Sequence, residues 1–103
     1  MSVNNRLLLD IQNRIRSANK GIINPEIPEL SVEQIIPVME MVAHARAAYL
    51  KALFNITDNC EGVVPSAGEV KKLALQRQIY EELVKGAQAL ETAIERGYLD
   101  IES

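Results

Sequence analysis

Few side chains in this sequence can bind a metal or act as a nucleophile, and the clearest candidates are His44 and Cys60. Glu40 precedes the histidine by one helical turn, so the two side chains share a helix face, but a zinc site needs at least three protein ligands. Cys60 lies between Asp58 and Glu61, and nearby carboxylates raise the pKa of a thiol. We therefore expect no metal, no cofactor and an unreactive cysteine.

His44 allows a second interpretation, in which it accepts a phosphoryl group. Histidine phosphotransfer domains expose one histidine on a helical bundle of about this size. They carry a Lys-Gly pair three and four residues after the histidine, whereas this chain has Ala47 and Ala48 at those positions. We favour a solvated His44 that pairs weakly with Glu40, and we keep a regulatory phosphotransfer domain as an alternative.

The motifs of common enzyme classes are absent from the sequence. It has no Gly-rich phosphate loop, no Ser-His-Asp set and no Cys-x-x-Cys pair. Glu81 and Lys85 form a favourable pair one helical turn apart, which is typical of a solvated helix face rather than of an acid–base pair. We therefore expect a protein that is not an enzyme.

Charge is unevenly distributed along the chain. The formal net charge is −3, but residues 1–20 carry four basic side chains against Asp10 alone, which leaves +3 there and −6 over the rest. The basic residues are Arg6, Arg14, Arg16 and Lys20. They are candidate contacts for an anionic partner, and a solvated helix face is the simpler interpretation that we favour. Four basic residues on one helix argue against nucleic acid as the main partner, because a protein that binds nucleic acid neutralises several phosphates.

Composition and patterning favour a cytoplasmic protein without a membrane segment. A single cysteine excludes an internal disulfide bond and fits a reducing compartment. The apolar run Leu7–Leu9 is too short for a signal peptide. The most apolar window, Ile35–Phe54, is interrupted by charged and titratable side chains, so we do not expect it to span a membrane.

The spacing of apolar residues predicts three helices, over residues 4–20, 31–55 and 66–96, with a Pro-rich linker at 21–30. Each predicted helix has apolar side chains at steps of three and four residues, which places them on one face. The stripe of the first helix comprises Leu7, Leu8, Ile11, Ile15 and Ala18. The stripe of the third comprises Val70, Leu73, Tyr80, Leu83, Val84, Ala87, Leu90 and Ile94.

Capping residues mark the ends of these predicted helices. Ser31 and Ser66 each precede a Gln or Glu by three residues, which is the capping-box pattern of a helix start. Gly21 and Gly97 each follow a cation and precede an apolar residue. Each glycine is therefore predicted to end a helix in the left-handed conformation.

The second helix is predicted to carry two apolar stripes side by side. One comprises Ile35, Met39, Val42, Tyr49, Leu53 and Ile56, and the other comprises Ile36, Ala43, Ala47, Leu50 and Phe54. A helix that is apolar over more than half its circumference is expected at the centre of a bundle. Pro37 lies past the first turn, which predicts either a kink or a short separate turn before the main helix.

These elements predict an all-α fold in a single domain of residues 1–103. We expect a long antiparallel hairpin of helices 31–55 and 66–96, with the shorter N-terminal helix packed along it as in a three-helix bundle. Because the N-terminal helix is too short to cover the hairpin, an uncovered apolar stripe is expected to form a homodimer with a larger helical bundle. The expected interface residues are Tyr49, Leu53, Phe54, Tyr80, Leu83, Leu90 and Ile94.

The function that fits this pattern is a non-catalytic helical protein–protein interaction or assembly module, adaptor-like or chaperone-like, with a protein partner. Two alternatives stay open: phosphotransfer through His44, and weak phosphate or nucleic-acid binding through the basic first helix. Two interpretations also remain for the C-terminal tail at 98–103, which is either an extended segment lying on the bundle or a frayed end.

Overall fold

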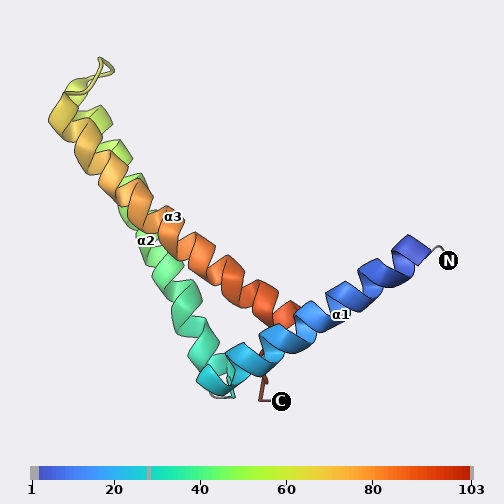
Figure 1. The fold of residues 1–103 in the computed structure, drawn as a ribbon. Coiled ribbons are helices and arrows are strands. Elements are labelled where there is room, and N and C mark those ends of the chain that lie inside the picture. Colours follow the sequence, from blue (N-terminus) through green and yellow to red (C-terminus); the bar gives the residue numbers. More distant parts are fainter. Residues whose placement is uncertain (1–2, 28, 103) are drawn as a thin grey trace. The chain divides into compact units, whose positions relative to one another are not determined.

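The structure is a computed structural model that describes residues 3–27 and 29–102 (Figure 1). Its elements are α1 (Val3–Ile23), the 3-10 turn η1 (Asn24–Glu26), α2 (Val32–Cys60) and α3 (Ala67–Glu95). The all-α fold class is confirmed, and α2 and α3 pack against each other as an antiparallel pair. Pro28 of the predicted linker and Ser103 of the predicted tail lie outside the described residues.

The chain divides into two compact units. One comprises residues 1–35 and 89–103, and so contains α1, the connection to α2 and the C-terminal end of α3. The other comprises residues 36–88 and contains the body of the helical hairpin. The prediction of a single domain, with the N-terminal helix packed along the hairpin, stays a prediction.

In the hairpin, the more deeply buried side chains of each helix recur at alternating steps of four and three residues. On α2 they are Val38, Val42, Ala45, Tyr49, Ala52 and Ile56. On α3 the row comprises Glu69, Leu73, Gln76, Tyr80, Leu83 and Ala87, and Ala74 and Val84 beside it are also half-buried. This is the spacing of an antiparallel coiled coil, in which each side chain inserts between residues of the facing helix. We call these two rows the hairpin seam.

The hairpin seam differs from the stripe that apolar content predicts for α2. Met39 and Leu53, which were expected on that stripe, are exposed, while Ala45 and Ala52 lie in the seam. Ala45 is the one described residue of the hairpin unit that is buried. Alanines at the seam allow the two helix axes to approach closely, toward the lower end of the range of about 8–10 Å.

The turn between α2 and α3 begins later than predicted. α2 continues through Thr57 and Asp58 to Cys60, whereas the sequence pattern placed its end near Asn55. The Thr57 hydroxyl donates a hydrogen bond of 2.7 Å to the carbonyl oxygen of Phe54, one turn earlier. The polar residues therefore remain helical, since their low propensities cost only tenths of a kcal/mol each. The helix ends where Glu61 takes a positive φ of 48°.

Both predicted helix starts carry part of a capping box. At α3, the backbone N–H of Glu69 donates to Ser66 Oγ at 3.2 Å. At α2, the backbone N–H of Ser31 donates to Gln34 Oε1 at 2.9 Å. Past the start of α2, the helix runs without interruption through Pro37, so the interpretation of a separate first turn is wrong.

Gly21 does not end the first helix, so the prediction of a linker beginning there is wrong. α1 continues through Gly21 to Ile23, and η1 follows with Pro25 in its first turn. A proline disfavours the helical conformation of the residue before it, which gives the stronger stop signal at this point. At the other end of the chain, Gly97 has a φ of 72° and ends α3 in the left-handed conformation as predicted.

The C-terminal tail is an extended segment held against the connection between α1 and α2. Leu30 and Ile101 form a parallel bridge, in which Leu30 N–H donates to the Asp100 carbonyl at 3.0 Å and Glu102 N–H to the Leu30 carbonyl at 2.7 Å. Asn24 completes the attachment through two hydrogen bonds to Asp100, one from its side-chain amide and one from the Asp100 backbone N–H. The frayed-end interpretation is therefore wrong for residues 98–102.

Replacing Ser66 tests the cap at the start of α3. We expect Ser66→Ala to lower the free energy of unfolding by about 1 kcal/mol, because the Glu69 N–H loses its acceptor. Ser17→Ala is the matched control, since Ser17 is an exposed residue in the middle of α1 and its loss should change stability by less than about 0.5 kcal/mol. Urea denaturation followed by circular dichroism measures both, and equal effects of the two substitutions would contradict the cap.

Candidate functional site

An exposed row of apolar side chains runs along α2 on a face other than the hairpin seam. It comprises Ile36, Met39, Ala43, Ala47, Leu50 and Phe54. We call this row the α2 outer stripe. Ile36 and Leu50 are 46% and 47% exposed, and Phe54 is 64% exposed. Large apolar side chains gathered on one helix face at this exposure mark a surface suited to packing against another element. The second of the two predicted α2 stripes contains five of these six residues.

The predicted interface residues fall into three groups in the structure. Tyr49, Tyr80 and Leu83 lie in the hairpin seam, where they are half-buried by the chain itself. Leu53 and Phe54 are exposed, and only Phe54 belongs to the α2 outer stripe. Leu90 and Ile94 are half-buried in the unit that contains α1. Their roles in contact with another molecule stay predictions.

A polar and aromatic cluster lies at the middle of the hairpin. The rings of Tyr49 and Tyr80 are 6.1 Å apart between centroids and tilted by 32°. The Arg46 guanidinium lies 5.4 Å from the centroid of the Tyr80 ring, and its Nε–H donates to the Tyr80 hydroxyl at 3.1 Å. Aromatic and cation–π contacts of this kind contribute about 0.5–1.5 kcal/mol each, so the cluster secures the register of α2 against α3.

α1 carries its apolar stripe and its basic residues on exposed surface. Described residues 3–18 of this helix are all exposed, and Asn19 and Ile23 are its half-buried residues. Leu8 of the stripe is 53% exposed, and Ile22, one turn beyond the last stripe residue Ala18, is 70% exposed. The four predicted anionic-partner contacts, Arg6, Arg14, Arg16 and Lys20, are also exposed. Arg14 Nε forms an ion pair of 3.0 Å with Asp10, but both side chains face solvent, so the pair is weak.

Tyr98 is the anchor of the unit that contains α1. It is 7% exposed, and Leu99 beside it is 5% exposed. Its hydroxyl bonds with Arg96 and with Asn19 of α1, and the charges of Arg96 and Arg16 lie nearby. The hydrogen bond with Arg96 is the main cause that lowers the pKa of the Tyr98 phenol, against the opposing effect of burial. Sequence reasoning missed this anchor, although an aromatic residue directly after a C-terminal glycine is a recognisable signal of a helix-end contact.

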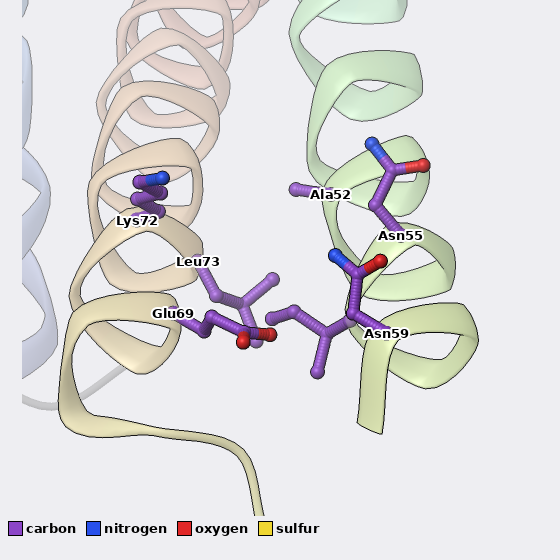
Figure 2. A pocket seen from close by; sticks show the side chains of 7 residues that line it. Ala52, Asn55, Asn59, Glu69, Lys72 and Leu73 are labelled. Carbon is purple, nitrogen blue, oxygen red and sulfur yellow. The ribbon is translucent and has the colours of Figure 1, made fainter. Parts of the chain in front are cut away.

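The tip of the hairpin has a small hollow between α2 and α3 (Figure 2). Its volume is about 220 Å³. Ala52, Asn55, Ile56 and Asn59 line it from α2, and Glu69, Lys72 and Leu73 line it from α3. Figure 2 shows the Ala52, Glu69 and Leu73 side chains directed into the space between the helices. The hollow is smaller than the pockets of about 300–1,000 Å³ that enclose small molecules, and we assign it no ligand.

Cys60 lies beside this hollow as a half-buried free thiol. Its Sγ–H donates a hydrogen bond of 3.3 Å to Oε2 of Glu69. Burial raises the pKa of the Cys60 thiol, and the hydrogen bond to Glu69 and the charge of that carboxylate raise it further. The expected direction of the shift is thus confirmed, but Glu69 is the carboxylate responsible rather than Asp58 or Glu61.

The described residues give no support to a metal centre. His44 is exposed on α2, and no group of three histidine, cysteine, aspartate or glutamate side chains in the described part of the chain could hold a metal ion. Among the described helices, none combines the length and the apolar character needed to cross a membrane.

Comparison with known proteins leaves the function to be argued from the structure alone. No family model matches the chain, and neither a curated protein nor a solved structure matches it.

The Cys60–Glu69 contact can be tested by thiol reactivity. We expect Glu69→Gln to lower the pKa of Cys60 and so to speed its reaction with an aromatic disulfide reagent near pH 8, because removing the negative charge favours the thiolate. Glu61→Gln is the matched control, since it removes a carboxylate that is adjacent in sequence but does not act on the thiol. If the reaction rate rose equally in both variants, the net charge near Cys60, and not the hydrogen bond with Glu69, would determine the reactivity of the thiol.

The Tyr98 contacts predict a pH dependence of stability. A folded-state pKa below that of the unfolded chain means that ionisation of Tyr98 adds stability as pH rises through the folded pKa toward 10, and that this gain is lost as pH falls again. We expect the difference in unfolding free energy between wild type and Tyr98→Phe to grow as pH rises toward 10. Urea denaturation at several pH values measures it. In an Arg96→Gln background, the increase of this free-energy difference with pH should be smaller. A difference that does not change with pH would contradict the lowered pKa of Tyr98.

Proposed function

We propose that the protein is a non-catalytic cytoplasmic assembly module that self-associates through the exposed apolar faces of its helices. The observation that carries this proposal is the small extent of its core. Ala45, Tyr98 and Leu99 are the buried apolar residues among those described, although 48% of the sequence is hydrophobic. Each large apolar side chain contributes about 1.5–3 kcal/mol when it is fully buried, so a chain that leaves so many exposed gains stability by association.

The α2 outer stripe is the surface that we assign to the interface. It lies on the hairpin, and its large residues flank Ala43 and Ala47, so a second helix can approach closely between Ile36 and Leu50. The hairpin seam is already occupied by contacts within the chain, such as those of Tyr49 with Tyr80. An adaptor-like or chaperone-like role toward a further protein would use the surfaces that remain free in the assembly.

The test is the mass of the purified chain in solution, measured by size exclusion with light scattering over a concentration series. We expect a dimer of twice 11.4 kDa. Phe54→Glu should weaken the dimer at least tenfold, because it places a charge on the outer stripe while leaving the hairpin seam intact. Its circular dichroism spectrum should match that of wild type.

Lys51→Glu is the matched control for this substitution. Lys51 is an exposed residue of the same helix, one turn before Asn55, and lies away from the outer stripe. We expect this variant to dimerise as wild type does. A wild-type chain that remains monomeric at every concentration, or a Phe54→Glu variant that dimerises normally, would overturn the proposal.

A further inference from the structure

We propose that α1 of one copy docks antiparallel on the α2 outer stripe of a second copy, so that two chains exchange their N-terminal helices reciprocally. This inference rests on the self-association proposed above and names the helix that binds to the α2 outer stripe. A two-fold dimer would contain the contact twice, because each copy provides both an α1 and an outer stripe.

The first argument is the spacing of exposed apolar residues on α1. Leu8, Ile11, Ile15, Ala18 and Ile22 recur at alternating steps of three and four residues and are all exposed. This is the pattern of a helix that packs against another helix along its length. The row from Leu8 to Ile22 is about 21 Å long, and the outer stripe from Ile36 to Phe54 is about 27 Å long, so the second can accommodate the first.

The second argument is the shape of the two rows. An antiparallel pairing that sets Ile22 opposite Ile36 and Leu8 opposite Leu50 also brings Ile15 opposite Ala43. The next turn likewise places Ile11 opposite Ala47. Large side chains of α1 then lie over small residues of α2, which is how two helices interdigitate without leaving a gap.

The third argument is charge. The second half of α1 is basic, with Arg14, Arg16 and Lys20, whereas the first half of α2 carries Glu33 and Glu40. Antiparallel packing brings Arg14, which borders the α1 row, toward Glu40, whereas Lys20 lies on the opposite face of α1 with Asn13. A parallel arrangement would instead bring Arg14 and Arg16 toward the half of α2 that contains Arg46, so like charges would meet at that end, which is unfavourable.

The fourth argument is the way in which α1 is held. Within its own unit, α1 is anchored at Asn19, by Tyr98, and just beyond its end, by the Asn24–Asp100 hydrogen bonds. The row residues Leu8, Ile11, Ile15 and Ala18 are exposed, so these side chains are accessible to a second copy.

Interchain cross-linking tests this arrangement in the full-length chain. Two differently tagged chains, both carrying Cys60→Ser, are mixed after their dimeric mass has been established. One carries Gln12→Cys, which borders the α1 row one turn after Leu8, and the other carries Ala47→Cys on the outer stripe. A short bis-maleimide should join the two chains. Asn13→Cys in place of Gln12→Cys is the matched control, because residue 13 lies on the opposite face of α1 and should give at least tenfold less product.

Each outcome separates this inference from the proposed function. A wild-type dimer without the Gln12–Ala47 product would leave self-association standing and overturn the exchange of α1. A chain that carries both cysteines, diluted into an excess of cysteine-free chain, should give no cross-link within itself; such a product would place α1 on its own hairpin and also overturn the inference. As a second measurement, Ile11→Glu should raise the dimer dissociation constant at least tenfold while Asn13→Glu leaves it unchanged.

Discussion

A pair of helices touches along one line, so neither helix can enclose a side chain of the other on all sides. In the hairpin this limit leaves Ala45 as the one buried residue of the described chain between 36 and 88, while Val42, Tyr49 and Ile56 of the hairpin seam reach only partial burial. Other large apolar side chains of α2 and α3, such as Ile36, Phe54 and Leu75, are exposed. Because hydrophobic stabilisation scales with the area removed from water, the hairpin realises only part of what its sequence can contribute, and a further layer of helices would supply the rest.

The same limit explains which parts of the hairpin the sequence could predict. Helices were predictable from apolar spacing and from caps, and Ser66 and Gly97 occupy the predicted positions with the predicted geometry. The row of α2 that faces α3 could not be predicted in the same way, because a hydrophobicity pattern favours large residues such as Met39 and Leu53. Close approach of two helices instead favours Ala45 and Ala52. The two stripes of α2 were recognised, but which of them lies inside depends on the partner helix.

Contacts between distant parts of the chain were beyond prediction for a different reason. Asn24 and Asp100 are separated by 76 residues, and no local pattern links an amide after the first helix to a carboxylate in the tail. The prediction that Gly21 ends the first helix was wrong. A left-handed glycine stabilises a helix end only where the residue that follows it packs against another part of the chain. Tyr98 has such a contact in Asn19 after Gly97, whereas Gly21 is simply absorbed into the longer helix.

Exposed apolar rows alone would make an indiscriminate surface, since many helices present residues at the same spacing. Charge restricts the choice. Ion pairs between exposed side chains contribute at most about 1 kcal/mol each, so Arg14, Arg16 and Glu40 add little to affinity. Their effect is to penalise the orientations in which like charges meet, which include the parallel pairing of α1 with α2 and the pairing of two basic α1 helices. In the proposed dimer, apolar area would thus supply the driving force for association, and the placement of a few charges would select antiparallel packing of α1 on α2 from the alternatives that the apolar rows allow.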